Sequence, residues 1–401
     1  MAGTFNFAGK ISLGKDTEKF HPVDRREFSS GWMNTTVKFN CISDTNRILC
    51  TAHGGKWKDN SRNVIKTFSK TTKDADGNTV KGEKIEIDWS DRFDPVNIDK
   101  VAGFRKYTCD TGDAKMRYKL RDLVKAFEEE TETEELIEET GIDNLDDAKE
   151  ALAKSEAKKH VFLSEWDFAE HIAKVAAADK FKDKKFYISG TYDVQYNPTN
   201  GRYYTSYHVN RVNLASDDAE PSTEMKIDMY FGDDAWDDNQ FTENGKCFVR
   251  GWIPYYDSSV KKNGFMPISV AVKENDKKNA LLKRKFAVDG NVKQIGLTIK
   301  VIDGAERMEL TMDMLDEETR EEIECGLLDW EEYKRSMGGT TIGERISELR
   351  FVELTPGKHI AQDTMYTVDD MQPARAVVEE ASKAETEPEL DLFAQDDEDD
   401  L

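Results

Sequence analysis

Cysteine, proline and long apolar runs are all scarce in this chain of 401 residues, which has five cysteines and nine prolines. An odd, scattered set of cysteines argues against a disulfide framework and favours a reducing compartment. The longest small apolar stretch, at residues 175–178, is far shorter than a membrane-spanning helix requires. The first residues lack the basic-then-apolar pattern of a secretion signal. We therefore expect a soluble, cytoplasmic protein.

Motifs of the common enzyme classes are also missing. The sequence has no GxxxxGK[ST] phosphate loop, no GxGxxG, no GxSxG and no HExxH. One acidic cluster offers oxygen ligands for Mg²⁺ and phosphodiester cleavage, but a solvated turn is the ordinary explanation of such a cluster in a Gly/Asp loop. Its members are Asp233, Asp234, Asp237 and Asp238. We therefore expect no catalysis.

A zinc site is the other chemical alternative. Cys41, Cys50, His53 and Cys109 provide four usable ligands with one Cys-x₂-His step. They lack the paired Cys-x₂-Cys spacing of structural zinc sites, so thiols on buried strands are the favoured interpretation. We expect neither a metal nor another cofactor, although the sequence leaves zinc open.

Apolar and aromatic residues are plentiful enough to fill cores. Hydrophobic residues make up 38% of the chain, which includes 7 Trp, 13 Tyr and 20 Phe. This composition excludes a wholly disordered chain. The length predicts roughly two domains.

Charge is segregated along the chain, whose formal net charge is −23. Lys and Arg outnumber Asp and Glu in residues 1–121, 158–215 and 246–300, whereas Asp and Glu dominate the stretches between them and the last 100 residues. The basic blocks have strand-like patterns, and the acidic blocks resemble helices, loops and a tail. Acidic helices can be merely solvated faces. The alternation as a whole instead indicates basic strands that face an anionic partner.

The first half alternates apolar and polar residues in the manner of strands and then becomes helical. A very acidic helical stretch occupies residues 119–157, and Ser164 caps a further helix. An Asn-Pro turn at 197–201 then joins two strands. The predicted strands are 5–13, 36–42, 47–50, 185–196 and 202–214.

This order, three strands, a helix and two strands, is the chain order of the OB-fold, a five-stranded Greek-key barrel that binds oligonucleotides. The last hairpin combines Tyr187-Ile188-Ser189-Gly190, an Asn-Pro turn and a Tyr-rich strand. It resembles the final hairpin of OB domains in replication protein A and in phage single-stranded DNA-binding proteins. The resemblance implies an OB-like DNA-binding domain over residues 1–215, with an acidic helical insertion at about 122–157.

The second half repeats parts of this pattern. Residues 247–256 and 265–272 are predicted strands joined by a turn at 261–264, and 294–301 and 349–354 are further strands. A helix is predicted over 316–335. We expect residues 216–372 to form a second, β-rich OB-like domain, and the whole chain to be mainly β with helical insertions.

Residues 373–401 have lost all periodicity and are predicted to be a disordered acidic tail. Apolar residues stand among the carboxylates at its end. The tail resembles the acidic C-terminal tails of bacterial and phage single-stranded DNA-binding proteins, although it ends in Asp-Asp-Leu rather than Pro-Phe. The resemblance implies that it recruits replication or recombination proteins and competes with DNA. The residues concerned are Leu392, Phe393, Asp396, Asp397, Asp399, Asp400 and Leu401.

Binding a single strand without sequence preference requires cations for phosphates and exposed rings for base stacking. The strongest candidates are aromatic residues flanked by cations in predicted loops, because a loop offers little core to fill. They are Trp32, in a loop with Arg25 and Arg26, and Trp57, between Lys56 and Lys58. On the strand at 203–211, alternation predicts that Tyr203, Tyr207 and Arg211 face the core, and that Tyr204 and His208 face solvent. The predicted nucleic-acid-binding residues are Arg25, Arg26, Trp32, Lys56, Trp57, Lys58, Arg62, Lys66, Arg105, Lys106, Tyr107, Arg117, Lys119, Arg202, Tyr204, His208, Arg250, Trp252 and Tyr255.

Together these features predict a phage-type single-stranded DNA-binding protein that coats and protects exposed strands in replication, recombination or repair. If it is phage-encoded, its expected location is the cytoplasm of a bacterial host cell. The main alternative is a non-enzymatic structural protein, such as a virion component that mediates assembly. A DNA mimic that presents carboxylates is a third, and the basic blocks argue against it.

Overall fold

The computed structural model describes residues 3–73, 77–237, 245–257, 259–273, 276–288, 290–337 and 340–376. Most of the regular structure in these ranges is β-strand, with helices inserted between strands. The predicted fold class, mainly β with helical insertions, is confirmed. None of the helices in the described ranges is long and apolar enough to cross a membrane.

Five strands of the first half close into a barrel. β1 (Thr4–Leu13) pairs antiparallel with β3 (Trp32–Ser43) and with β11 (Lys185–Asn197). β3 continues into β4 (Asn46–Trp57), and β11 into β12 (Arg202–Leu214), through antiparallel hairpins. A short parallel pairing of β12 with β4 closes the circle. This connectivity, including the parallel pair, is that of an OB-fold.

Helix α5 (Glu165–Ala177) lies between the third and fourth barrel strands in the chain, as the sequence predicts. The Ser164 side chain accepts a hydrogen bond from the Asp167 backbone N–H and so begins the helix. The buried face of α5 carries Phe168 and Ile172, which join Phe7, Phe39 and Phe186 in the core. The helix therefore covers one open end of the barrel, because its apolar side chains enter the space between the strands.

The second half forms a barrel of the same connectivity. β13 (Ser222–Phe231) pairs antiparallel with β15 (Lys246–Asp257) and β17 (Lys293–Glu309). β16 (Lys262–Lys273) pairs antiparallel with β15, β18 (Thr340–Leu354) pairs antiparallel with β17, and a parallel β16–β18 pairing closes the barrel. Helix α7 (Asp276–Phe286) again stands between the third and fourth strands.

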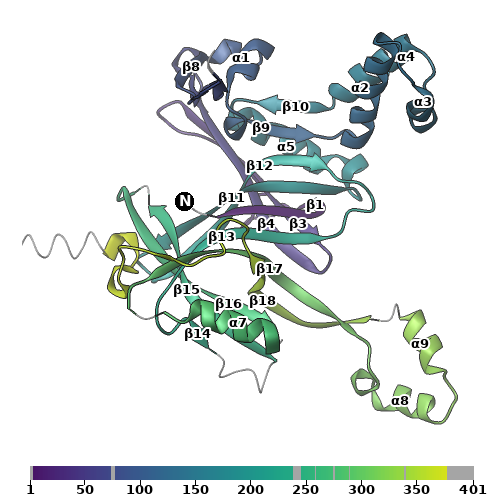
Figure 1. The fold of residues 1–401 in the computed structure, drawn as a ribbon, viewed down its shortest axis with the longest axis vertical. Coiled ribbons are helices and arrows are strands. Elements are labelled where there is room, and N and C mark those ends of the chain that lie inside the picture. Colours follow the sequence, from purple (N-terminus) through teal and green to yellow (C-terminus); the bar gives the residue numbers. More distant parts are fainter. Residues whose placement is uncertain are drawn as a thin grey trace, which may run out of the picture.

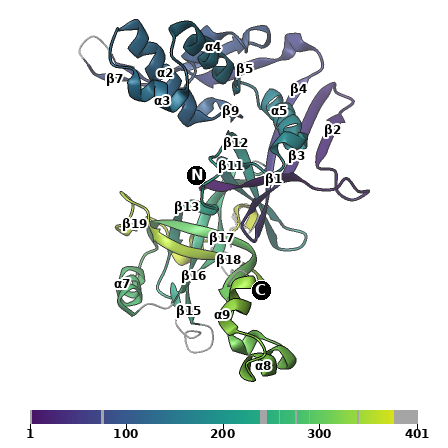
Figure 2. The same cartoon turned by 90° about the vertical axis from the view of Figure 1, so that its right-hand side faces the viewer.

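The two barrels share one sheet. β1 pairs with β13 from Thr4↔Lys226 to Ala8↔Ser222, and the buried side chains of both halves form one hydrophobic cluster. Figures 1 and 2 show the barrels side by side across this junction. The predicted domain ranges, 1–215 and 216–372, stay a prediction. Backbone hydrogen bonds between β1 and β13 link the two ranges.

Between β4 and α5 the chain makes a long excursion (Figure 1). Its first part, with β5 (Val64–Phe68), β8 (Lys84–Asp88) and α1 (Pro95–Lys100), has a small core of its own around Trp89. The acidic part is helical as predicted. It consists of α2 (Ala114–Glu128), α3 (Glu134–Thr140) and α4 (Leu145–Glu156), flanked by β9 (Tyr107–Asp110) and β10 (Lys159–Phe162).

Three local predictions are wrong. The residues placed in loops lie on strands: Arg25 and Arg26 in β2 (Val23–Glu27), Trp32 at the start of β3, and Trp57 at the end of β4. The helix predicted over 316–335 is two helices, α8 (Glu317–Glu324) and α9 (Trp330–Ser336), which project from the end of the molecule opposite α2–α4. Residues 262–264 belong to β16, not to a turn. Gly264 is needed there because a Cβ would lie 2.2 Å from the Ala374 backbone nitrogen.

The last described segment, which includes β19 (Gln362–Asp363), lies across the second barrel. Tyr366 and Met371 pack with Trp252 and Phe265 on the outer side of that barrel. The Phe265 backbone N–H donates to the Gln372 carbonyl at 2.8 Å. We call residues 362–376 the C-terminal strap. The predicted tail residues from 377 onward, including Leu392, Phe393 and Leu401, lie outside the described ranges.

Candidate functional site

The outer face of β3 and β4 is a polar surface on the first barrel. Alternate residues such as Val37, Phe39 and Cys50 are buried, so their neighbours point outward. We call the outward set the β3–β4 face. It comprises the cross-strand pairs Trp32–Trp57, Thr36–His53, Lys38–Thr51, Asn40–Leu49 and Ile42–Arg47.

Aromatic rings and a guanidinium group gather at one end of this face. Trp32 and Trp57 meet edge to face, with ring centroids 5.2 Å apart. The Arg62 guanidinium carbon lies 3.5 Å from the Trp57 ring centroid. Gly55 leaves room for this arrangement, because a Cβ at that position would lie 2.1 Å from the Trp32 ring. The side chain of Asn63 holds the Trp57 backbone, accepting from its N–H at 2.7 Å and donating to its carbonyl at 2.9 Å.

The lysines predicted near these rings are engaged with other side chains. Lys58 contacts Glu27 at 2.8 Å, and Lys66 contacts Glu86 at 3.1 Å. The Lys56 ammonium lies 5.2 Å from the Trp166 ring centroid. These surface pairs contribute little stability and exchange readily for another anion. Arg47, at the other end of the face, is exposed and makes no ion pair within the described ranges.

The first half of β12 extends the β3–β4 face sideways. Its residue His208 pairs with Thr51 of β4, and its ring lies 4.8 Å from that of His53. Burial, and secondarily the nearby His208, lowers the pKa of His53. Tyr204 is half exposed, and its hydroxyl accepts from the Asn200 side chain at 2.8 Å. Tyr204 and His208 therefore lie on the outer side of the barrel, as alternation predicts.

Arg211 is a surface residue that the sequence assigned to the core. The register with β11 changes from Gly190↔Val209 to Ser189↔Arg211, so Asn210 is an extra residue in β12. This bulge reverses the alternation, and Arg211 becomes exposed while Val212 is buried. No sequence signal distinguished this strand from a regular one.

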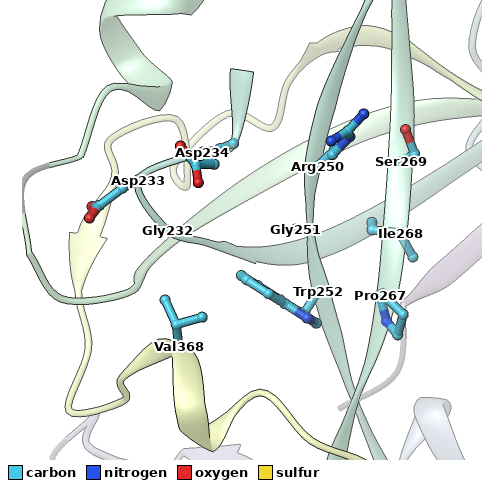
Figure 3. Close-up of a pocket in the computed structure, with 11 residues that line it drawn as sticks. Gly232, Asp233, Asp234, Arg250, Gly251, Trp252, Pro267, Ile268, Ser269 and Val368 are labelled. Atoms are coloured by element: carbon cyan, nitrogen blue, oxygen red, sulfur yellow. The ribbon is translucent and has the colours of Figure 1, made fainter. Parts of the chain in front are cut away.

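The corresponding side of the second barrel holds a cavity of about 610 Å³ (Figure 3). Trp252 and Pro267 line it from neighbouring strands, and Val368 of the C-terminal strap lines it from the other side. Asp233 and Asp234 also contribute to its wall. Arg250, another predicted contact, reaches this cavity while its guanidinium pairs with Asp237.

Two predicted contacts are almost fully buried. Arg117 is 4% exposed, and its guanidinium donates to both carboxylate oxygens of Asp110 at 2.5 and 2.8 Å. Tyr255 is 2% exposed, and its hydroxyl accepts from the Ala374 backbone N–H. Alternating cationic and aromatic residues occur both on binding surfaces and in buried polar contacts, so the sequence pattern did not distinguish these two cases.

The remaining predicted residues are dispersed. Arg25 pairs with Glu170, Arg26 with Asp24, and Lys119 with Glu139. Tyr107 donates to Glu165 at 2.5 Å, and burial raises the pKa of its hydroxyl. Three predicted contacts remain. The Arg105 guanidinium carbon lies 5.1 Å from the Phe68 ring centroid, Lys106 follows it in the chain, and Arg202 is exposed at the start of β12.

The metal alternatives gain no support from the geometry. The three thiols of the suggested zinc set are fully buried, and burial raises the pKa of Cys41 and of Cys109 to about 12. His53 points away from them, on the outer side of β4. Asp237 is held by Arg250, and Asp238 lies outside the described ranges. The described residues contain no group of three or more His, Cys, Asp or Glu placed to hold a metal ion.

Solved structures that match this chain include two of the single-stranded DNA-binding protein from Thermus aquaticus. The wild-type structure shares 6% sequence identity over 90% of this chain and 96% of that chain, with a TM-score of 0.31. The structure of a deletion mutant shares 7% sequence identity over 75% of this chain and 86% of that chain, with a TM-score of 0.28. No family model and no curated protein matches the sequence.

Proposed function

We propose that this protein binds single-stranded DNA on the β3–β4 face of its first barrel. The observation that carries the proposal is the Trp32–Trp57–Arg62 group, which stands on an outward strand face of an OB-fold. Aromatic rings and guanidinium groups stack with bases of any sequence. Bases in a duplex are already stacked and paired, so this surface favours an unpaired strand.

The charges around the face are consistent with such binding despite the acidic chain. Lys58 contacts one exposed carboxylate, and Arg47 makes no ion pair within the described ranges. A phosphate backbone can replace such carboxylates and release its own counterions. We therefore expect affinity to fall steeply as salt concentration rises.

The proposed role is to coat and protect exposed strands during replication or recombination. The acidic segment after Ala376 would recruit partner proteins and compete with DNA for the basic surfaces. This role rests on the composition of residues 377–401 and on its resemblance to the tails of single-stranded DNA-binding proteins.

The test is fluorescence anisotropy of a labelled thymidine oligonucleotide and of a matched duplex, over a range of salt concentrations. The full chain and a chain ending at Ala376 are compared. We expect salt-sensitive binding that selects the single strand and becomes severalfold tighter after truncation, because the removed segment is strongly acidic. Absence of binding by both chains would refute the proposal and favour the assembly protein.

Replacing Trp57 by alanine is expected to weaken single-strand binding by about 1–3 kcal/mol, because the stacking surface and the support for Arg62 are lost together. Trp330→Ala is the matched control, since Trp330 stacks on Tyr333 in α9. Anisotropy titrations of both variants, with circular dichroism to verify folding, measure the difference. Equal affinities for the folded Trp57 and Trp330 variants would remove Trp57 from the site.

A further inference from the structure

A second cavity lies beside the first barrel, where the helical excursion meets β12. It has a volume of about 330 Å³. We call it the α2 pocket. Its lining residues come from β9, α2, β10 and β12, and they are Thr108, Asp110, Ala114, Arg117, Tyr118, Arg121, Lys159, Arg211 and Asn213.

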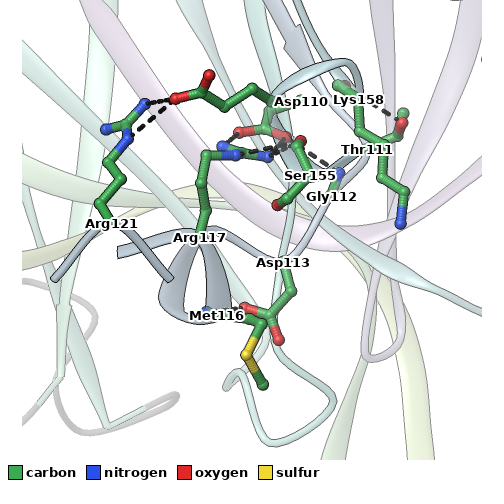
Figure 4. A network of polar contacts seen from close by, with 10 residues as sticks. Asp110, Thr111, Gly112, Asp113, Met116, Arg117, Arg121, Ser155 and Lys158 are labelled. Carbon is green, nitrogen blue, oxygen red and sulfur yellow. Dashed lines mark hydrogen bonds and ion pairs between the residues drawn. The ribbon is translucent and has the colours of Figure 1, made fainter. Parts of the chain in front are cut away.

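The pocket has an excess of positive charge. Four of its residues are cations and one is a carboxylate. That carboxylate, Asp110, is held by Arg117, and Glu156 just outside is held by Arg121 at 2.9 Å (Figure 4). Lys159 and Arg211 are exposed and make no ion pair within the described part of the chain.

This excess of cations over carboxylates attracts an anion. The Arg117–Asp110 pair also makes the wall rigid, because the same guanidinium donates to the Ser155 carbonyl at 3.0 and 3.2 Å.

The remaining lining residues suit a nucleotide. Thr108 and Asn213 bring side chains that hydrogen-bond to phosphate or sugar oxygens. Tyr118 is 64% exposed, and the Arg121 guanidinium carbon lies 5.8 Å from its ring centroid. An exposed ring beside a cationic cavity offers stacking for a base whose phosphate enters the cavity.

We propose that the α2 pocket binds a nucleotide phosphate, with Lys159 and Arg211 as its ligands and Tyr118 as the stacking surface for the attached base. The inference rests on the proposed function and extends it. β12 carries His208 beside the β3–β4 face and Arg211 in the pocket, three residues apart, or about 10 Å along the β-strand. A DNA strand bound to the β3–β4 face thus has a phosphate site within reach.

The test uses the full chain with the paired substitution Lys159→Ser and Arg211→Ser. Both side chains are exposed, so folding is preserved. The control is Lys182→Ser, an exposed lysine that does not line the pocket. We expect the paired variant to bind a labelled thymidine oligonucleotide about tenfold more weakly than the control, because two charge-assisted contacts are lost. The slope of log affinity against log salt should decrease by about 1.4, the value for two phosphate contacts on a single strand.

Titration with free thymidine monophosphate distinguishes a pocket that binds a phosphate of a DNA strand from one that binds a free nucleotide. If wild-type protein binds the oligonucleotide and the paired variant matches the control in affinity and salt slope, the pocket proposal is wrong and the proposed function stands. If wild-type protein binds no oligonucleotide, the proposed function fails. In that case, thymidine monophosphate binding that is lost in the paired variant supports the pocket as a free-nucleotide site, and absence of such binding overturns it.

Discussion

Replacing Arg117 by alanine is expected to lower the free energy of unfolding of the α2–α4 region by about 3–5 kcal/mol. The substitution leaves the buried carboxylate of Asp110 without its cation, and the Ser155 carbonyl of α4 loses its donor. An uncompensated buried charge costs far more than an exposed pair contributes. The effect is on folding, because Arg117 is almost wholly buried.

Arg121→Ala is the control for this prediction. Arg121 pairs with Glu156 on the same helix face, but the pair is solvent-exposed and contributes at most about 1 kcal/mol. Hydrogen exchange of the α2 backbone amides, together with urea unfolding followed by circular dichroism, measures both variants. Equal protection of α2 in the two variants would contradict the structural role of Arg117.

Replacing Tyr255 by alanine is expected to cost about 3–5 kcal/mol of stability in the second barrel, the usual loss when a buried aromatic ring is removed. Tyr255 is among the largest buried side chains, and its ring packs edge to face on Tyr203 at 6.0 Å. Its hydroxyl also holds the C-terminal strap through Ala374. The strap should therefore loosen together with the barrel.

Tyr255→Phe separates the ring from the hydroxyl. It retains the packing and loses one hydrogen bond, so we expect a loss of about 1 kcal/mol and unchanged affinity for single-stranded DNA. Thermal unfolding and anisotropy titrations measure the two effects. A folded Tyr255→Phe protein that bound DNA much more weakly would show that this residue does contact the ligand.

Local patterns in the sequence were sufficient to predict nine of the ten described barrel strands, whereas β13 and helix α7 were not predicted. Period-2 alternation predicted the barrel strands of the first half, because one side of each strand is buried there. The Ser164 cap and the apolar spacing from Phe168 to Val175 predicted α5 for a similarly local reason. The aromatic residues Trp32 and Trp57 are also brought together as neighbours, although the sequence suggested two separate loops.

Features that depend on distant partners could not be predicted in this way. Arg211 faces outward because of a bulge that its own strand does not signal. Gly264 was assigned to a turn, but a glycine is required there because the backbone of Ala374, more than 100 residues later, lies against it. Tyr255 and Arg117 were assigned to the surface because their buried partners, Ala374 and Asp110, are not apparent from spacing alone.

The pairing of β1 with β13 has a consequence for how the molecule behaves on dilution. A protein assembled from two separate one-barrel chains falls apart when its concentration drops below the dissociation constant. Here both barrels belong to one polypeptide and share backbone hydrogen bonds, so their 1:1 ratio is independent of concentration. The two halves are also free to acquire different substitutions, and they differ already: the strap packs against Trp252 of the second barrel, whereas Arg62 lies against Trp57 of the first.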